Sequence, residues 1–278
     1  MAERKDIHSS EIAEGKRFEF GKNWKRFLTV LNDDRIASAE LSLKQMLEIE
    51  DLKDKRFLDV GSGSGLFSLA ARRLGAKVFS LDYDPQSVAC TSELRSRYFP
   101  KDENWIIEEG SVLDLGYIQS LGKFDIVYSW GVLHHTGNLW KALNNVQYPV
   151  ENDGILFIGL YNDEGFMSEV WKKIKRIYCS GTFGKVVIFG IYFPYFFFKR
   201  SIADILRLRN PLDRYATYKR KRGMSALYDV IDWLGGYPYE VASNGSIFDF
   251  YRKNKFQLMK LKTGCGHSIN EFVLKKTG

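Results

Sequence analysis

A glycine-rich turn at residues 57–65 constrains the fold more than any other feature of this sequence. The segment FLDVGSGSG starts as a short apolar strand, passes through Asp59 and ends in three alternating glycines. Glycines so placed let a chain turn sharply from a strand into a helix and pass close beneath a ligand. The turn alone is weak evidence for a ligand, because many glycine turns only connect core elements. The segments that follow it are therefore needed to interpret it.

The next apolar segment ends in an acid. Residues 77–81 are predicted to form a second strand, and Asp82 follows directly in VFSLDYDP. An acid at the end of this strand can accept hydrogen bonds from ribose hydroxyls. Domains that bind NAD and domains that bind S-adenosylmethionine both use this arrangement, so the strand and its acid leave both cofactors open.

Three details favour S-adenosylmethionine. The turn has the pattern GxGxG followed by Leu66, so the third glycine of the dinucleotide pattern GxGxxG is misplaced. Asp59 precedes the first glycine by two residues, which suits a cofactor that carries an amino-acid ammonium and no pyrophosphate. The segment GSVLD, residues 110–114, follows a third predicted strand, where an adenine ring would be framed.

Strand-like and helical segments alternate from residue 56 onward. The predicted strands span residues 57–60, 77–81, 105–107, 124–130 and 155–160, with helices over about 65–74 and 138–147. This alternation is typical of right-handed βαβ units. Two more strands, at 256–262 and 271–275, flank a glycine-containing turn. We therefore expect an α/β fold with a doubly wound seven-stranded sheet, mostly parallel with a terminal antiparallel hairpin.

The segments FLDVGSGSG, LDYD, EEGSVLD and FDIVYSWGVLHHTG resemble class I S-adenosylmethionine-dependent methyltransferases, and among these the small-molecule group, in order and spacing. The resemblance covers about residues 55–162 and the terminal hairpin. It implies an enzyme with S-adenosylmethionine as its cofactor, and it specifies no acceptor.

The resemblance implies a role for each matching residue. Asp59 and the glycine turn would hold the methionine part, Asp82 the ribose, and Ser111 with Val112 the adenine. The family often has an acid where Ser111 stands. The full set of predicted cofactor-binding residues is Asp59, Gly61, Ser62, Gly63, Gly65, Asp82, Tyr83, Ser111, Val112, Ser129 and Trp130.

Two adjacent histidines follow the fourth predicted strand. Methyl transfer to a hydroxyl requires orientation and a base, and a histidine suits the second task. Adjacent side chains point in different directions, so we expect one to face the pocket, and His135 is preferred over His134. The alternative is that His134 packs or caps the turn and His135 only lines the pocket. The sequence near the two histidines contains no clear set of metal-binding residues. The three cysteines form no CxxC pair, so no zinc site is predicted from them either.

Other residues are candidates for contact with the substrate. Trp24, together with Phe20, lies in an aromatic segment before the sheet that either covers the site or attaches a helix to the core. Tyr161 follows the fifth strand, and His267 lies with Cys265 in the turn of the terminal hairpin. The alternative for Tyr161 and His267 is a position in surface loops.

The net charge of +7 on this 278-residue chain belongs to one segment. Residues 164–222 hold fourteen Lys and Arg and four Asp and Glu, a net charge of +10, whereas the rest of the chain carries −3. A local basic segment predicts a contact surface and not general polyanion binding. Part of it, YKRKRGMS at 218–225, either binds a phosphate or carboxylate of the substrate or forms a solvated linker.

The same segment contains VVIFGIYFPYFFF, residues 186–198, an apolar run that is predicted to be broken by Gly190 and Pro194. A membrane-spanning helix needs about 20 apolar residues, so this run is predicted to be too short. A buried helical subdomain with a basic rim is the plainest interpretation. Peripheral membrane contact through 168–209, an apolar substrate pocket and a dimer face are the alternatives.

We expect four regions: a helical extension (1–50), the cofactor-binding core (51–162), a basic, partly apolar helical insert (163–235) and the completion of the sheet (236–278). The N-terminal segment has no apolar signal region, so a cytoplasmic location is expected, with peripheral contact at the inner membrane face as a further expectation.

The leading hypothesis for function is methylation of a hydroxyl on a small, possibly anionic molecule: a glycan precursor, nucleotide-linked sugar, lipid or phenol-like metabolite. The alternatives are an RNA- or tRNA-modifying methyltransferase and, less favoured, a non-catalytic or membrane-peripheral partner protein. No RNA-binding module is recognisable in the sequence, so a nucleic-acid partner is disfavoured.

Overall fold

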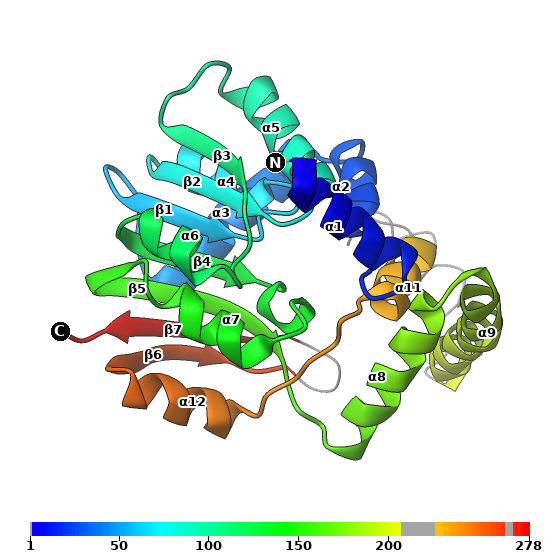
Figure 1. Cartoon of the computed structure of the whole chain (residues 1–278). Coiled ribbons are helices and arrows are strands. Elements are labelled where there is room, and N and C mark those ends of the chain that lie inside the picture. The colour runs from blue at the N-terminus through cyan, green and yellow to red at the C-terminus, as the bar shows by residue number, and fades with distance from the viewer. Residues whose placement is uncertain (1, 207–225, 265–268) are drawn as a thin grey trace.

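The computed structural model describes residues 2–206, 226–264 and 269–278 (Figure 1). The predicted site residues His267 and Cys265 and the basic cluster at 218–225 lie outside these described residues.

A seven-stranded sheet forms the centre of the molecule, in the order β3-β2-β1-β4-β5-β7-β6. Strands β1 to β5 pair in parallel, whereas β7 runs antiparallel to both β5 and β6. This confirms the predicted doubly wound sheet with a terminal antiparallel hairpin. The strands are β1 (Arg56–Val60), β2 (Lys77–Asp82), β3 (Trp105–Glu109), β4 (Phe124–Trp130), β5 (Val150–Tyr161), β6 (Phe256–Lys262) and β7 (Ile269–Lys276).

Strand β5 begins five residues earlier than the sequence predicts. Its first residues after Val150 are polar and exposed, so they lack the apolar run that marks the rest of the strand. Backbone pairing of Phe124 with Val150 brings this polar stretch into the sheet.

Helices cover both faces of the sheet (Figure 1). One face packs on α3 (Asp33–Leu47), α4 (Leu66–Arg73) and α5 (Pro85–Tyr98). The other face packs on α6 (Leu115–Ser120), α7 (Leu139–Val146) and α12 (Asn244–Lys253). Apolar side chains on both sides of the central strands are buried, which is what a strand sandwiched between two helical layers requires.

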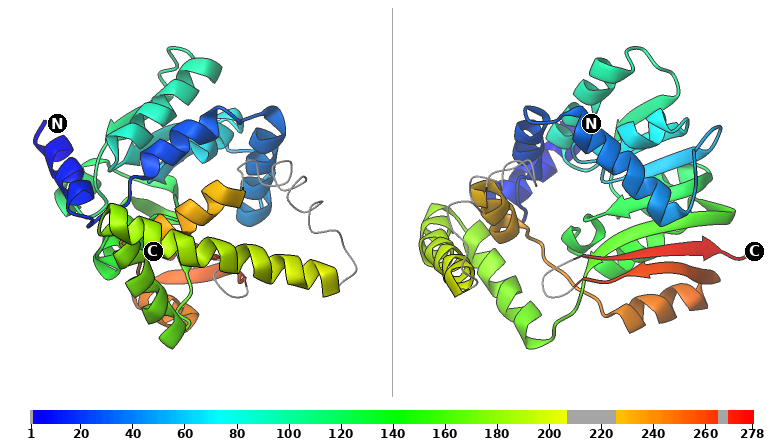
Figure 2. Two further views of the ribbon diagram at one scale, coloured as in Figure 1. Left: turned by 90° about the vertical axis from the view of Figure 1, so that its right-hand side faces the viewer. Right: turned by 180° about the vertical axis from the view of Figure 1, so that it is seen from behind.

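Two groups of helices extend this core. Helices α1 (Ala2–Ala13) and α2 (Phe20–Leu28) precede α3, and a short 3-10 turn η1 (Leu133–His135) follows β4. Helices α8 (Phe166–Cys179), α9 (Thr182–Leu206) and α11 (Ala226–Gly235) lie together at one end of the sheet, near α1 and α2 (Figures 1 and 2). They share a third apolar cluster with Trp171, Leu234 and Tyr239 at its centre.

Helix α9 continues through Gly190 and Pro194, where the sequence predicts a break. Pro194 is exposed, and a proline inside a helix removes one backbone hydrogen bond without necessarily ending the helix. Among the helices the structure describes, none is both long and apolar enough to cross a membrane.

The packing of β5 predicts a measurable loss of stability when Phe157 is replaced. This side chain is 1% exposed, and its ring lies edge-on to Tyr128 at 5.1 Å. Phe157→Ala should lower the free energy of unfolding by about 3–5 kcal/mol. Met259→Ala on β6, where the side chain is 55% exposed, should change it by less than about 0.5 kcal/mol. Urea denaturation of both variants measures the difference, and equal losses would contradict the assignment of the core.

Candidate active site

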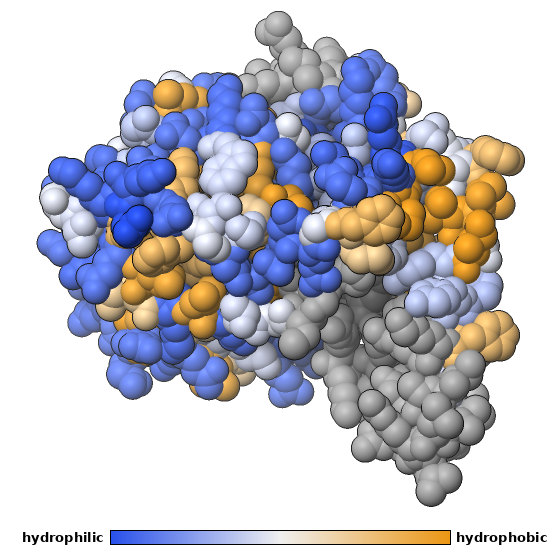
Figure 3. Space-filling view, turned by 90° about the horizontal axis from the view of Figure 1, so that it is seen from below, coloured by the Kyte–Doolittle hydropathy of each residue, from blue (hydrophilic) through white to orange (hydrophobic). Residues whose placement is uncertain are grey.

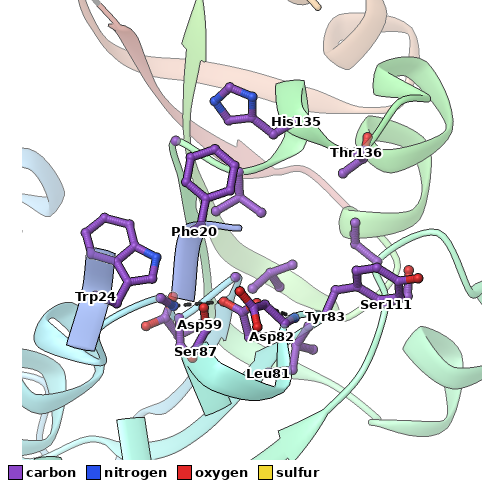
Figure 4. A pocket seen from close by; sticks show the side chains of 18 of the residues that line it. Phe20, Trp24, Asp59, Leu81, Asp82, Tyr83, Ser87, Ser111, His135 and Thr136 are labelled. Atoms are coloured by element: carbon purple, nitrogen blue, oxygen red, sulfur yellow. Dashed lines mark hydrogen bonds between the residues drawn. The ribbon is translucent and has the colours of Figure 1, made fainter. Parts of the chain in front are cut away.

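A cavity of about 630 Å³ lies beyond the carboxyl ends of β1, β2 and β4 (Figure 4). Its volume falls within the range of about 300–1,000 Å³ that is usual for small-molecule sites. Its walls come from the glycine turn, the strand ends and the N-terminal extension. The predicted residues that line it are Trp24, Asp59, Gly61, Ser62, Gly63, Asp82, Tyr83, Ser111, Val112, Trp130 and His135.

The glycine turn brings backbone to the floor of this cavity. Gly61 has a φ of 83°, and a Cβ there would collide with Val132. Gly63 has a φ of 55°, and its Cβ would lie 3.1 Å from the indole of Trp24. Gly65 differs: it precedes α4, and its Cβ would lie 2.9 Å from the backbone of Thr91. Gly65 therefore positions α4, and the prediction that it contacts the cofactor is corrected to a structural role.

Asp82 links the turn to the end of β2. Its Oδ2 accepts a hydrogen bond from the Gly63 N–H at 2.9 Å, and its Oδ1 accepts one from the Asp84 N–H at 2.9 Å. Burial raises the pKa of Asp82 to about 6, although these backbone donors act in the opposite direction. Each carboxylate oxygen has a second lone pair for a ligand hydroxyl.

Asp59 lies deeper, at the end of a buried hydrogen-bond chain. The Ser68 hydroxyl donates to Asp59 Oδ2 at 2.5 Å, and Ser68 is 2.7 Å from the hydroxyl of Ser80, which accepts from the Trp105 indole. Burial raises the pKa of Asp59 to about 7, and the nearby charge of Asp82 adds to this shift. A positively charged ligand would stabilise the ionised form of both carboxyls. The cavity therefore favours a ligand that carries a positive charge.

The N-terminal extension closes one side of the cavity. The Gly21 N–H donates to Asp84 Oδ2 at 2.8 Å, and a Cβ at Gly21 would collide with Gln86. The Phe20 ring lies 5.1 Å from the ring of His135, and Figure 4 shows both beside the cavity with Trp24. Both aromatic residues predicted as covering residues, Phe20 and Trp24, are thus cavity-lining.

His135 is held by a distant backbone carbonyl. Its Nδ1 lies 2.6 Å from the oxygen of Pro238. Because a carbonyl only accepts, Nδ1 carries the proton and Nε2 presents a lone pair. Burial lowers the pKa of His135 to about 3, so the ring is neutral at physiological pH.

Three other predicted residues, Ser129, His134 and Tyr161, do not line the cavity. Ser129 is fully buried, and its hydroxyl donates to the Val60 carbonyl at 2.9 Å, joining β4 to β1. The His134 ring lies 4.1 Å from that of Tyr161, within the aromatic cluster that joins the core to α8 and α11. Neither ring nitrogen of His134 has a hydrogen-bond partner among the described residues.

Ser129, His134 and Tyr161 are therefore not among the residues that line the cavity. The rings of His134 and His135 lie 4.3 Å apart, and of the two only His135 lines the cavity. Tyr161 packs against Trp233 and Tyr239 at ring separations of 5.7 and 5.4 Å. The geometry supports His135 as the catalytic candidate and does not support His134.

Two predicted residues are in the cavity but already have partners. The Ser111 hydroxyl accepts from the Leu113 N–H at 3.2 Å, so it shapes the turn after β3. The Trp130 indole donates to Glu271 Oε1 at 2.8 Å, which fixes its ring against β7.

Sequence reasoning did not identify several lining residues of the extension. Arg17 donates from Nη1 to the His135 carbonyl at 3.1 Å, forms an ion pair with Glu11 at 2.7 Å and lies 4.8 Å from the centre of the Tyr83 ring. His8 also lines the cavity. The mixed basic and aromatic composition of KRFEF was the only available signal. Among the described residues, no group of three or more His, Cys, Asp or Glu could hold a metal ion.

Comparisons with known proteins agree with this site. Residues 58–158 match a methyltransferase domain family. The ribosomal protein L11 methyltransferase of Prochlorococcus marinus strain MIT 9312 is 33% identical over 132 residues, which are 46% of this chain and 41% of that protein. The protein of the same name from Leptospira interrogans serovar copenhageni is 45% identical over 114 residues, 41% of this chain and 36% of that protein. This chain thus matches about two fifths of the length of these relatives.

Solved structures share the fold at low sequence identity. Magnesium protoporphyrin IX methyltransferase from Synechocystis PCC 6803, solved with bound S-adenosylhomocysteine, superposes with a TM-score of 0.55 at 12% identity, covering 92% of this chain and 95% of that one. PKMT2 from Rickettsia typhi gives a TM-score of 0.55 at 16% identity, covering 80% and 49%. Residues 58–158 thus match a methyltransferase domain family, and the chain shares its fold with methyltransferases of known structure, in agreement with the resemblance to class I S-adenosylmethionine-dependent methyltransferases.

The raised pKa of Asp59 predicts that cofactor affinity depends on pH. The ammonium of S-adenosylhomocysteine favours ionised Asp59, so binding requires loss of a proton from a group whose pKa is about 7 in the empty site. Affinity should therefore rise about ten-fold between pH 6 and pH 8. Isothermal titration calorimetry measures this trend.

The Asp59→Asn variant should bind S-adenosylhomocysteine more weakly and with a flatter pH dependence. Asp249→Asn, at an exposed acid on α12, is the matched control and should behave like the unmodified protein. An equally steep pH dependence in Asp59→Asn would show that another group releases the proton.

Proposed function

We propose that this protein transfers a methyl group from S-adenosylmethionine to a hydroxyl of a small molecule. The observation that carries this proposal is the position of His135 in the same cavity as Asp59 and Asp82, with its Nδ1 hydrogen-bonded to Pro238. The residues proposed to bind the cofactor and a neutral imidazole thus line one cavity.

The cavity residues fit this cofactor. Asp59 would take the ammonium, Asp82 would accept from the ribose hydroxyls, and the backbone at Gly61 and Gly63 leaves room for the methionine part. Ser111 and Val112 would flank the adenine. When bound, S-adenosylmethionine supplies a methyl group that is already activated by its sulfonium.

His135 would orient the acceptor. Its Nε2 lone pair accepts the hydrogen bond of the acceptor hydroxyl and directs the oxygen toward the methyl group. The cofactor would supply the methyl group and leave as S-adenosylhomocysteine, and Nε2 would take the hydroxyl proton. Because burial lowers the pKa of His135, orientation is expected to contribute more than basicity.

The covered cavity favours a small acceptor. Phe18, Phe20 and Arg17 of the extension form its wall next to His135. A protein segment would have to displace these residues to reach His135, whereas a small molecule could enter the cavity without moving them. Among the described lining residues, Arg17 is the only Lys or Arg, which provides little charge for tracking an RNA backbone.

A protein acceptor is the second candidate. Its support is the name of the matching relatives, ribosomal protein L11 methyltransferase, although the match covers less than half of this chain. Labelled-methyl transfer from S-adenosylmethionine into fractionated cell extract separates the candidates. Label in the lipid, glycan or metabolite pools supports the proposal, label in protein or RNA supports the corresponding alternative, and no label in any pool favours a non-catalytic role.

Replacing the candidate catalytic residue should separate turnover from binding. His135→Ala is expected to lower kcat by at least about 100-fold, because the acceptor hydroxyl loses both its orienting partner and its proton acceptor. Its affinity for S-adenosylhomocysteine should stay within about two-fold of the unmodified protein. Kinetics on the labelled acceptor fraction and calorimetry provide the two measurements.

His8→Ala is the matched control, since His8 lines the cofactor end of the same cavity, 5.4 Å from the Tyr83 ring. It should alter the KM for the cofactor and leave kcat nearly unchanged. If His135→Ala keeps kcat within a few-fold, His135 is not the orienting base.

A further inference from the structure

Helix α9 presents an apolar face to solvent. Its exposed side chains recur at spacings of three to five residues, which places them along one side of the helix. The exposed fractions are 84% for Phe183, 66% for Val186, 68% for Ile191, 55% for Tyr195 and 62% for Phe198. Soluble surfaces carry single exposed apolar residues routinely, but a contiguous row of this kind marks an interaction site.

The opposite side of α9 is occupied by the protein itself. Ile188, Phe189 and Phe193 pack against the third apolar cluster, where the Tyr192 ring lies 5.4 Å from that of Trp171. Residues between Ile188 and Phe193 thus hold α9 against the cluster, whereas Phe183, Val186 and Ile191 are exposed. Figure 3 shows hydrophobic side chains gathered at this end of the molecule.

Helix α8 also exposes apolar side chains. Phe166 is 80% exposed, and Ile177 is 47% exposed. Lys173 falls between them at helical spacing and is also exposed. We call the exposed side chains of α8 and α9 named above, from Phe166 to Phe198, the α8–α9 surface.

Basic side chains accompany this apolar row. Lys172, Lys173, Arg176 and Lys185 are exposed, and no described carboxylate lies within ion-pair distance of them. The wider segment 164–222 carries a net charge of +10. Long basic side chains beside an apolar helix face can reach phosphate groups while the face enters the acyl boundary.

We infer that the α8–α9 surface docks on an anionic lipid bilayer. Exposed apolar and basic side chains of α8 and α9 complement the acyl and phosphate layers of such a membrane. A second copy of this chain fits less well, because it would bring two segments of charge +10 together. This inference is independent of the proposed function, since it concerns a surface whose residues do not line the cavity.

Vesicle flotation of the purified full-length protein, without cofactor, tests this inference. The protein should bind vesicles of phosphatidylcholine with about 30% phosphatidylglycerol at least about ten-fold more tightly than vesicles of phosphatidylcholine alone. The double variant F183S/I191S should weaken this binding at least about ten-fold. K173E/K185E should abolish most of the preference for anionic lipid.

Two control variants make the same kinds of substitution elsewhere on the surface. L41S/M259S changes two apolar residues that are 54% and 55% exposed on α3 and β6, and K141E/K253E changes two exposed lysines on α7 and α12. Both should bind vesicles like the unmodified protein. Affinity for S-adenosylhomocysteine should be the same in all four variants, so a folding defect or a failed cofactor assignment is detected separately.

Two results would overturn the inference. One is absence of binding to the anionic vesicles. This result includes the case in which analytical ultracentrifugation shows that the unmodified protein is a dimer and that F183S/I191S is a monomer, because the surface would then be a dimer interface. The other is vesicle binding that F183S/I191S and its control L41S/M259S weaken equally.

Discussion

The carboxylate of Asp82 holds together the parts of the molecule that form the cavity. One of its oxygens accepts from Gly63 in the turn after β1, and the other accepts from Asp84 at the start of α5. Asp84 in turn caps α5 and accepts from Gly21 of the extension. The glycine turn, the end of β2 and the wall of the cavity are therefore positioned by two neighbouring acids. Because Asp82 is half-buried, its hydrogen bonds with the backbone are partly shielded from solvent.

The part of the cavity around His135 combines a residue of the matched domain with segments that lie outside it. His135 receives a hydrogen bond from Arg17 on its carbonyl and donates one from its ring to Pro238. The Phe18 N–H donates to the Tyr237 carbonyl at 2.9 Å, so the extension and the segment after α11 also contact each other. The family match ends at residue 158. Under the proposed function, residues outside the matched domain would therefore shape the acceptor side of the cavity.

The cofactor half of the site was predictable because its signals are local. Asp59, Gly61, Gly63 and Asp82 fall on consecutive strand ends, and parallel strands bring those ends to one edge of the sheet. The acceptor half depends on contacts that no local pattern encodes. Pro238 reaches His135 through a backbone carbonyl 103 residues away in the chain, which explains why spacing alone left the choice between two histidines open. Ser129 was misassigned because proximity to a strand end does not specify which way a side chain points.

The central claim is that Asp82 and the glycine turn bind S-adenosylmethionine and not a dinucleotide. Isothermal titration of S-adenosylhomocysteine and of NAD into the unmodified protein and into Asp82→Asn tests it most directly. The account predicts binding of one S-adenosylhomocysteine per chain, at least about ten-fold weaker binding in Asp82→Asn, and no heat from NAD. Binding of NAD with similar affinity, or S-adenosylhomocysteine binding that is unaffected by Asp82→Asn, would contradict it.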